Sequence, residues 1–449
     1  MSAYNWLSEK IILPAGDLLL HTTIAEKLHF LMQSQYMSYN ELQAFQDDRL
    51  KGMIRHAYEN VPFYNNLFKQ LKLRPADIKS KTDLHKLPVI TKKDLRKFHP
   101  VQYLAGNLSP RKFIRFNSSG STGEPLQYFC SGESYSMNYA SAIRGWYWMG
   151  YRLGDTYAKL SQNPRQGLFK KIQDRANRSY YIFIRDLTKP NLLKTIAELN
   201  RTRPQFIRCY PDPLYFMARL MLAGEKLAYK PKAINSTGNI LTPDMRKTIE
   251  LAFDTVVYDS YSCESSAQFF ESPGREAYLA SMEYAITEVL DEQGNEANVG
   301  RHVTTDLWNM AMPFIRYDTQ DIIVKSVTPP SAPRKLEHFS QIWGRDTDIL
   351  VTPSGKLLIV HTFTIFFEYF EQVEQFQVIQ PRADLFQVLL RVTVNFSSET
   401  ENNIRNGLAQ LVGNDVRIDI EIVSDIPLLK SGKRKFLVRA GDIKLPAYA

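Results

Sequence analysis

The chain has 449 residues, about three times the length of a typical domain, which predicts two or three domains. Hydrophobic residues make up 44% and aromatic residues 12%, enough to bury a sizeable core, so an intrinsically disordered protein is excluded. The formal net charge of +9 is a mild excess for this length, and we expect no nucleic-acid partner.

Cysteine usage and the N-terminus indicate the compartment. Three cysteines, Cys130, Cys209 and Cys263, show no paired spacing, which argues against a disulfide scaffold or a cysteine-rich zinc module. Charged residues and Pro14 interrupt the apolar stretch of residues 1–20, so it lacks the clean apolar region of a signal peptide. We therefore expect a cytoplasmic protein with no structural zinc site.

The sequence predicts no transmembrane segment, because no run of eighteen uncharged apolar residues occurs. Peripheral membrane contact stays open, since the apolar residues of 11–13 and 18–20, with nearby lysines, could lie on a bilayer surface. The simpler interpretation is a helix packed on its own domain.

Apolar spacing predicts an α/β fold in two parts. Residues 20–100 have helical periodicity punctuated by prolines, and from about residue 113 strand-like runs alternate with helical ones. Residues 278–325 read as strands, and the proline-rich stretch after residue 325 is a loop. The last 100 residues or so, with several strands and one helix near residues 399–411, predict a small α+β domain.

The most basic segment spans residues 165–189, with seven Lys or Arg against two Asp. A solvated helix face is the default explanation for such a run. Attraction of an anionic substrate or of a membrane surface is the alternative.

A cluster of hydroxyls and glycines lies between two strand-like runs. Two glycines let the backbone turn sharply, and hydroxyl and N–H groups can cradle phosphate oxygens without a Walker lysine. An ordinary turn is the alternative interpretation of the cluster. Its members are Ser118, Ser119, Gly120, Ser121, Thr122 and Gly123.

Four further motifs accompany this cluster. Tyr-Ser-Cys-Glu occupies residues 261–264, and Arg-Tyr-Asp-Thr-Gln-Asp-Ile occupies residues 316–322. Gly-Arg-Asp-Thr-Asp follows at 344–348, and Lys-Ser-Gly-Lys-Arg-Lys at 430–435. The series, in this order, resembles the adenylate-forming superfamily of acyl-CoA synthetases and related ligases.

Other segments narrow the resemblance. Residues 56–64, 87–92 and 306–316 are similar to signatures of phenylacetate-CoA ligase-like proteins. The pattern is nearest to the CapK-type branch, which is associated with capsular polysaccharide biosynthesis. The resemblance covers nearly the whole chain.

The resemblance implies a reaction and a nucleotide site. ATP would adenylate a carboxylic acid with release of pyrophosphate, and an acceptor such as CoA, an amine or a sugar hydroxyl would then attack the acyl-AMP. The loop of residues 118–123 would hold the β- and γ-phosphates. Glu264 would coordinate the Mg²⁺ that accompanies ATP. Tyr261 would stack on the adenine.

The remaining implied site residues surround the ribose and the α-phosphate. Asp321 would accept hydrogen bonds from the ribose hydroxyls, and Arg345 would approach the ribose or the α-phosphate. Gly238 would let backbone approach the adenine, although an ordinary strand-end turn is an equal alternative. Lys433 is the implied catalytic lysine, because a point charge on a flexible stem suits charge developing at the α-phosphate.

The resemblance also implies two domains joined by a hinge. Residues 1–345 would form a multi-layer adenylation domain that includes the helical residues 1–110, and residues 349–449 a mobile α+β lid. Thr347 and Asp348 would be the hinge, although the pattern usually has Asp at position 347. Gln320 replaces the usual glycine of the Thr-Gly-Asp triplet.

The expected function is therefore acyl-adenylate formation in polysaccharide or cell-envelope biosynthesis. An aryl-CoA ligase of catabolism shares every motif and is the first alternative, and a non-catalytic nucleotide-binding scaffold is the second. The acid would lie against residues 135–148 and 210–215, whose aromatic side chains fit either an aryl acid or a sugar.

Overall fold

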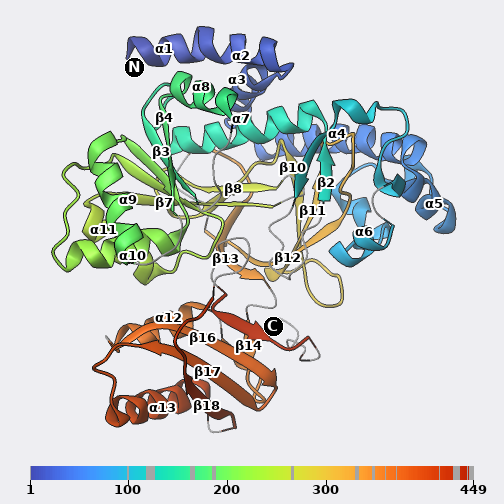
Figure 1. Cartoon of the computed structure of the whole chain (residues 1–449). Helices are drawn as coiled ribbons and strands as arrows, with labels where there is room; N and C mark the ends of the chain where they lie inside the picture. The colour runs from blue at the N-terminus through green and yellow to red at the C-terminus, as the bar shows by residue number, and fades with distance from the viewer. Residues whose placement is uncertain are drawn as a thin grey trace.

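The computed structural model describes residues 2–98, 101–117, 127–161, 167–184, 189–263, 267–328, 333–345, 349–358, 360–370, 372–413, 415–427, 435–441 and 443. Figure 1 shows a large body built around strands, with helices outside them, and a smaller C-terminal lobe below it. The predicted α/β class agrees with this arrangement.

Short helices form most of the first hundred residues, as the apolar spacing predicts. Pro62 opens one of them at its first turn, where the missing N–H costs nothing. The elements are α1 (Ala3–Leu7), the π-helical turn η1 (Ser8–Ile12), α2 (Leu13–Leu20), α3 (Ile24–Ser34), α4 (Tyr39–Asn60), α5 (Pro62–Gln70), η2 (Pro75–Asp77), η3 (Lys81–Lys86), α6 (Lys92–Phe98), η4 (Val101–Tyr103) and η5 (Pro110–Lys112).

One eleven-stranded sheet organises the large body, in the order β10-β11-β12-β13-β9-β8-β7-β6-β5-β3-β4. Five of its strands are parallel to one another: β3 (Tyr157–Ser161), β4 (Ser179–Phe183), β5 (Phe206–Cys209), β6 (Ala233–Thr237) and β7 (Val256–Ser262). The other six pair antiparallel: β8 (Gln268–Glu271), β9 (Tyr278–Ala280), β10 (Ala285–Leu290), β11 (Val299–Asp306), β12 (Tyr317–Lys325) and β13 (His338–Arg345).

Helices cover both faces of the parallel strands (Figure 1). One apolar core joins these strands to α9 (Lys189–Thr202), α10 (Pro211–Leu222) and α11 (Pro243–Phe253). The long helix α7 (Gly132–Trp148) packs on the other face, and α8 (Leu168–Ala176) lies against β4. A separate hairpin of β1 (Ile114–Asn117) and β2 (Gln127–Cys130) precedes α7.

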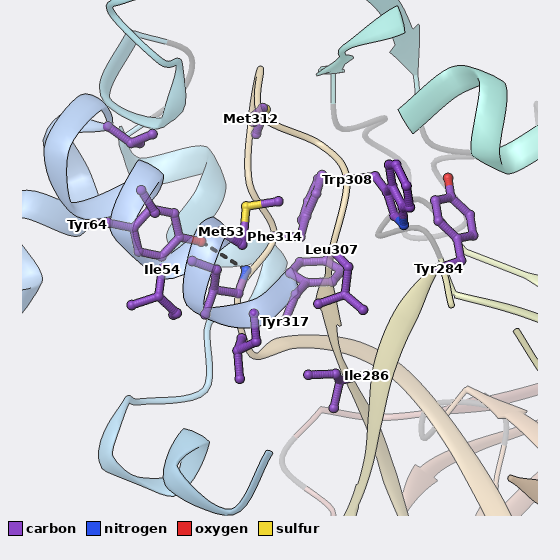
Figure 2. Packing of buried hydrophobic residues seen from close by; sticks show 14 of the residues in the cluster. Met53, Ile54, Tyr64, Tyr284, Ile286, Leu307, Trp308, Met312, Phe314 and Tyr317 are labelled. Carbon is purple, nitrogen blue, oxygen red and sulfur yellow. Dashed lines mark hydrogen bonds between the residues drawn. The ribbon is translucent and has the colours of Figure 1, made fainter. Parts of the chain in front are cut away.

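The three segments that resemble phenylacetate-CoA ligases contact one another in the core. His56 Nε2 lies 2.8 Å from the carbonyl oxygen of Met310, and the Tyr64 hydroxyl donates to Pro313 O at 2.9 Å. Ile315 N–H donates to the same hydroxyl at 3.1 Å, the bond drawn in Figure 2. The resemblance in sequence therefore follows a shared packing arrangement.

The C-terminal lobe has its own apolar core. A four-stranded sheet, in the order β18-β17-β16-β19, packs against two helices. The elements are β14 (Leu350–Val351), β15 (Leu357–Leu358), α12 (Val360–Glu368), β16 (Val373–Arg382), β17 (Leu385–Val392), α13 (Ser398–Val412), β18 (Arg417–Ile422) and β19 (Leu437–Arg439).

The division into residues 1–345, 346–348 and 349–449 stays a prediction.

Within the ranges given above, no helix is long and apolar enough to cross a membrane.

The Tyr64 hydroxyl generates a stability prediction. Tyr64→Phe leaves Ile315 N–H and Pro313 O buried without their partner, so the free energy of unfolding should fall by about 1–3 kcal/mol. Tyr58→Phe is the matched control, because Tyr58 packs on the same core and makes no hydroxyl hydrogen bond to the described part of the chain. Urea denaturation measures both, and equal losses in the two variants would contradict the role of the Tyr64 hydroxyl.

Candidate active site

Gly238 directly follows β6, at the carboxyl edge of the parallel strands. Its φ is +78°, and a Cβ atom at this position would come within 2.6 Å of the Tyr210 ring. Only glycine therefore fits here without a shift of Tyr210. Ligands of parallel sheets bind at this edge, so bare backbone is presented where the sequence places the adenine. The geometry is compatible with both sequence interpretations of Gly238.

Tyr261, on β7, contacts two residues from distant strands. Its hydroxyl donates to Asp321 Oδ2, on β12, at 2.6 Å, and lies 3.1 Å from Nδ1 of His302, on β11. Because the hydroxyl proton goes to Asp321, His302 must carry its proton on Nδ1 and donate it to the Tyr261 oxygen. A chain of hydrogen bonds therefore runs from His302 through Tyr261 to Asp321 and fixes the orientation of this carboxylate.

Burial sets the protonation states in this chain. Burial lowers the pKa of His302 to about 3, so the imidazole is neutral near pH 7. Burial, followed by the negative charge of Asp321, raises the pKa of Tyr261 well above its ordinary value, so its hydroxyl keeps its proton. Two neutral groups, the His302 imidazole and the Tyr261 phenol, therefore lie beside the Asp321 carboxyl group.

The triplet Thr319-Gln320-Asp321 keeps a glycine-like backbone without glycine. Gln320 has φ +67°, in the left-handed region that ordinary residues seldom adopt. Its N–H donates to Asp318 Oδ1 at 2.7 Å, and Asp321 N–H donates to Thr319 Oγ1 at 3.2 Å. These bonds accompany the left-handed conformation of Gln320, which a glycine would adopt freely.

Gly344 lies near the end of β13, beside the part of β12 that carries Asp321. Its φ is +80°, and a Cβ atom there would lie 2.8 Å from Ile240 Cδ1. The next residue, Arg345, pairs through its backbone with Asp321 in the β12–β13 ladder. Ile240 also packs against the core of the C-terminal lobe. The predicted nucleotide residues that the structure describes, Gly238, Tyr261, Asp321 and the backbone of Arg345, therefore lie near the contact between the two parts of the chain.

The predicted phosphate loop connects β1 and β2. Asn117 and Gln127 are register partners in this hairpin, so the two ends of the loop lie side by side. The loop itself falls outside the described residues, as does the side chain of Arg345. The other predicted site residues outside the described ranges are Glu264, Thr347, Asp348 and Lys433, and the loop residues are Ser118, Ser119, Gly120, Ser121, Thr122 and Gly123.

Helix α7 lies beside the candidate site, where the sequence places the acid. The Tyr135 and Tyr139 rings lie 4.7 Å apart near its start, and Trp146 Nε1 near its end donates to Asn235 Oδ1 on β6 at 3.3 Å. The helix thus begins next to the β1–β2 hairpin and reaches β6 near its C-terminal end.

Sequence reasoning missed His302, which is a lone histidine in a strand with no motif around it. Its relation to the Thr-Gln-Asp triplet appears only in the structure, where the pairing of β11 with β12 brings the two together.

His302 generates a pH prediction. Its pKa in the folded chain is about 3, below the ordinary 6.5, so the unfolded chain binds the proton first as the pH falls. Its contribution to stability is therefore complete above about pH 6.5 and is lost progressively toward pH 3. His302→Gln removes this linkage, so the stability difference between wild type and variant should shrink by up to about 1.4 kcal/mol per pH unit below pH 6.

Urea denaturation at pH 7.5, 6.5, 5.5 and 4.5 measures this difference. The loss of the hydrogen bond to Tyr261 changes the stability of the variant by the same amount at every pH. The change of the stability difference with pH therefore reports the titration of His302. A difference that stays constant over this range would show that His302 titrates normally in the folded chain.

Several known sequences are similar to this chain. The CapK C-terminal domain matches residues 350–440. Protein CapK of Staphylococcus aureus is 23% identical over 412 residues, which cover 89% of each chain. The phenylacetate-coenzyme A ligase of Aromatoleum evansii is 27% identical over 70% of this chain and 72% of its own. The corresponding Escherichia coli ligase is 43% identical over 89 residues, 20% of each chain.

Solved structures share the fold. 2-Hydroxyisobutyryl-CoA ligase in the postadenylation state, in complex with R3-HIB-AMP, has a TM-score of 0.73 at 16% identity, over 91% of this chain and 92% of its own. The same ligase with 2-HIB-AMP and CoA in the thioesterification state has a TM-score of 0.60 at 18% identity, over 90% and 91%. These findings confirm the fold class and support the prediction of an enzyme. The chain is related to CapK and the phenylacetate-CoA ligases and has the fold of the adenylate-forming ligases.

Proposed function

We propose that this protein is an ATP-dependent ligase that activates a carboxylic acid as acyl-AMP, releases pyrophosphate and transfers the acyl group to an acceptor. The observation that carries the proposal is the Tyr261–Asp321 contact at the carboxyl edge of the sheet. Two sequence motifs, far apart in the chain, meet there beside the backbone of Gly238.

The described residues fit a nucleotide. Asp321 is held by Tyr261 in one orientation and would accept hydrogen bonds from the ribose hydroxyls. Gly238 would present backbone to the adenine, and Arg345 would extend from the end of β13 toward the ribose or the α-phosphate. The Tyr261 ring centre lies 5.2 Å from that of Phe269 and 5.6 Å from that of His302, and the rest of its surface would stack on the adenine.

The other roles follow the motifs. Residues 118–123 would grip the β- and γ-phosphates, and Glu264 would bind the Mg²⁺ that neutralises them. Lys433 would approach the α-phosphate and the acid carboxylate from the C-terminal lobe. Thr347 and Asp348 would form the hinge between an adenylation domain of residues 1–345 and a lid of residues 349–449.

The structures of 2-hydroxyisobutyryl-CoA ligase in two reaction states support the proposed division into an adenylation domain and a mobile lid. Its postadenylation and thioesterification structures contain acyl-AMP, and the second also contains CoA. We propose that the present chain likewise presents Lys433 in one lid orientation and an acceptor, CoA or another nucleophile, in a second.

Two biological roles remain as proposals. The CapK relative supports a role in polysaccharide or cell-envelope biosynthesis, inside the cell. The alternative is an aryl-CoA ligase of catabolism, which the phenylacetate-CoA ligase relatives support. Acceptor preference separates them: a catabolic enzyme should use CoA with an aryl acid, whereas a biosynthetic enzyme should prefer a non-aryl acid or a sugar acceptor.

Acid-dependent exchange of pyrophosphate into ATP tests the activity. With a panel of carboxylates, at least one acid should support exchange, and Lys433→Ala should lower its rate by about 100-fold or more. Lys430→Ala is the matched control in the same basic segment and should retain most of the activity. Asp321→Asn should weaken ATP binding in calorimetry, because one ribose acceptor becomes a donor. Release of ADP and phosphate, or an active Lys433→Ala, would contradict the proposal.

A further inference from the structure

Arg208, on β5, is a half-buried cation without a carboxylate partner. Its Nε is buried and makes no hydrogen bond, and no described acidic residue forms a salt bridge with its guanidinium. The guanidinium instead lies 5.7 Å from the centre of the Trp146 ring on α7. An arginine in such surroundings normally has an anionic or hydrogen-bonding partner, because removing its charge from water is costly.

The neighbouring strands place polar side chains beside it. Arg208 is the register partner of Lys159 on β3 and of Asn235 on β6. Ile207 and Cys209 face the core under α9–α11, so the alternate residue Arg208 faces α7, as do its register partners.

The position of Arg208 relates it to the candidate site. Tyr210, two residues further along, packs against Gly238 at the carboxyl edge, where its ring occupies the space that a Cβ atom would need. Two residues of extended strand span about 7 Å, so Arg208 lies roughly this far below the edge. The charge of Arg208 also reaches Tyr157 and Tyr210, where it opposes the rise in pKa that burial causes. This place lies between α7 and the sheet, where the acid is expected.

We infer that Arg208 binds a second anionic group on the acid substrate. This inference rests on the proposed acid activation and specifies its substrate class. The reacting carboxylate would lie at the carboxyl edge near Gly238, and the second charge, a carboxylate or a phosphate, would reach down to Arg208. A phosphate of the acceptor has the same chemistry, and the experiment separates the two sources.

Paired acids provide the test. Pyrophosphate exchange and thermal shift are measured with butyrate and succinate, hexanoate and adipate, and benzoate and terephthalate. At least one diacid should exceed its monoacid partner about tenfold in kcat/KM, and Arg208→Gln should remove this preference, as the loss of a charged hydrogen bond predicts. Lys232→Gln is the control, because Lys232 is an exposed cation near the ring of Phe206 at the start of the same strands.

The outcomes distinguish the two proposals. If a monoacid supports exchange and Arg208→Gln changes no preference, the Arg208 inference fails and the proposed function stands. If no acid supports exchange, the proposed function fails, and thermal shifts by diacids decide whether Arg208 binds anions. If Arg208→Gln raises only the KM for CoA in the transfer step, the anion belongs to the acceptor and the inference about the acid is wrong.

A second, independent observation concerns the N-terminal helical segment of α1, η1 and α2. Surface helices normally bury their apolar side, but this segment buries Asn5 and Ser8, at 4% and 6% exposure. Asn5 Nδ2 donates to Leu153 O at 2.9 Å and to Asp155 Oδ1 at 3.0 Å. The outward side is apolar and carries Trp6, Ile11, Leu18, Leu19 and Leu20, which are 42–80% exposed.

The charges around this segment are arranged asymmetrically. Its carboxylates turn toward the protein: Glu9 accepts from the Tyr147 hydroxyl at 2.5 Å, and Asp17 accepts from Ile24 N–H at 3.0 Å. Helix α8 lies alongside, since the Tyr4 hydroxyl donates to Ala176 O at 2.9 Å. Figure 1 shows α1, α2 and α8 together at one end of the large body. On α8, Ile172 is 60% exposed between the exposed cations Lys171 and Arg175.

We propose that these side chains form a membrane face that binds the surface of an anionic bilayer. The face consists of Trp6, Ile11, Leu18, Leu19, Leu20, Lys171, Ile172 and Arg175. Its apolar members would enter the interface between headgroups and acyl chains while Lys171 and Arg175 meet lipid phosphates. Charge complementarity selects this partner, because the outward apolar side is flanked by cations.

Vesicle co-sedimentation tests the membrane face. The protein should bind vesicles of phosphatidylglycerol and phosphatidylcholine more than pure phosphatidylcholine, and 0.5 M salt should weaken this binding. Leu18→Ser/Leu19→Ser and Lys171→Glu/Arg175→Glu should each reduce it severalfold. Leu251→Ser/Val327→Ser is the control, with residues that are 67% and 91% exposed outside the membrane face.

Two results would overturn this proposal. One is vesicle binding that neither double variant changes. The other is a dimer in light scattering that Leu18→Ser/Leu19→Ser dissociates while vesicles bind nothing, since a second copy of the chain would then cover the apolar side.

Discussion

The hydrogen bond between Tyr261 and Asp321 imposes the constraint on which the candidate site depends. These residues lie on β7 and β12, and three strands separate the two in the sheet order. In a flat sheet four strand spacings would separate them by about 19 Å. A 2.6 Å contact therefore requires the sheet to curl strongly, and the aromatic rings of Phe269 and Phe339, stacked at 4.8 Å, fill the inside of the curl.

The N-terminal helices hold the strand that carries Asp321. Ile90 N–H donates to Arg316 O at 2.9 Å, and Asp318 N–H donates to Ile90 O at 2.9 Å, so the segment after η3 pairs with the start of β12. Arg316 also donates to Leu87 O at 2.6 Å. The helical layer is thus bonded to the start of β12, the strand that carries Asp321.

Much of the site is predictable from the sequence because its motifs are local. The Thr-Gln-Asp triplet lies within β12, Gly344 lies within β13 and Gly238 directly follows β6, and each of the three has a residue with positive φ. Gln320 N–H donates to Asp318, and Asp321 N–H donates to Thr319. His302 was not predictable, because its role comes from a strand partner and not from its neighbours in the chain.

The sequence by itself determined the α/β class, the helical start, the small α+β end and the order of the motifs, since periodicity and turn chemistry act over a few residues. It left open whether residues 1–20 pack inward or face a bilayer, and it did not single out Arg208. Only the tertiary structure shows that Asn5 and Ser8 are buried while Trp6 and Leu18 are exposed, and that Arg208 lies beside the Trp146 ring. Which side of a helix is buried depends on residues far away in the chain, such as Leu153 for Asn5.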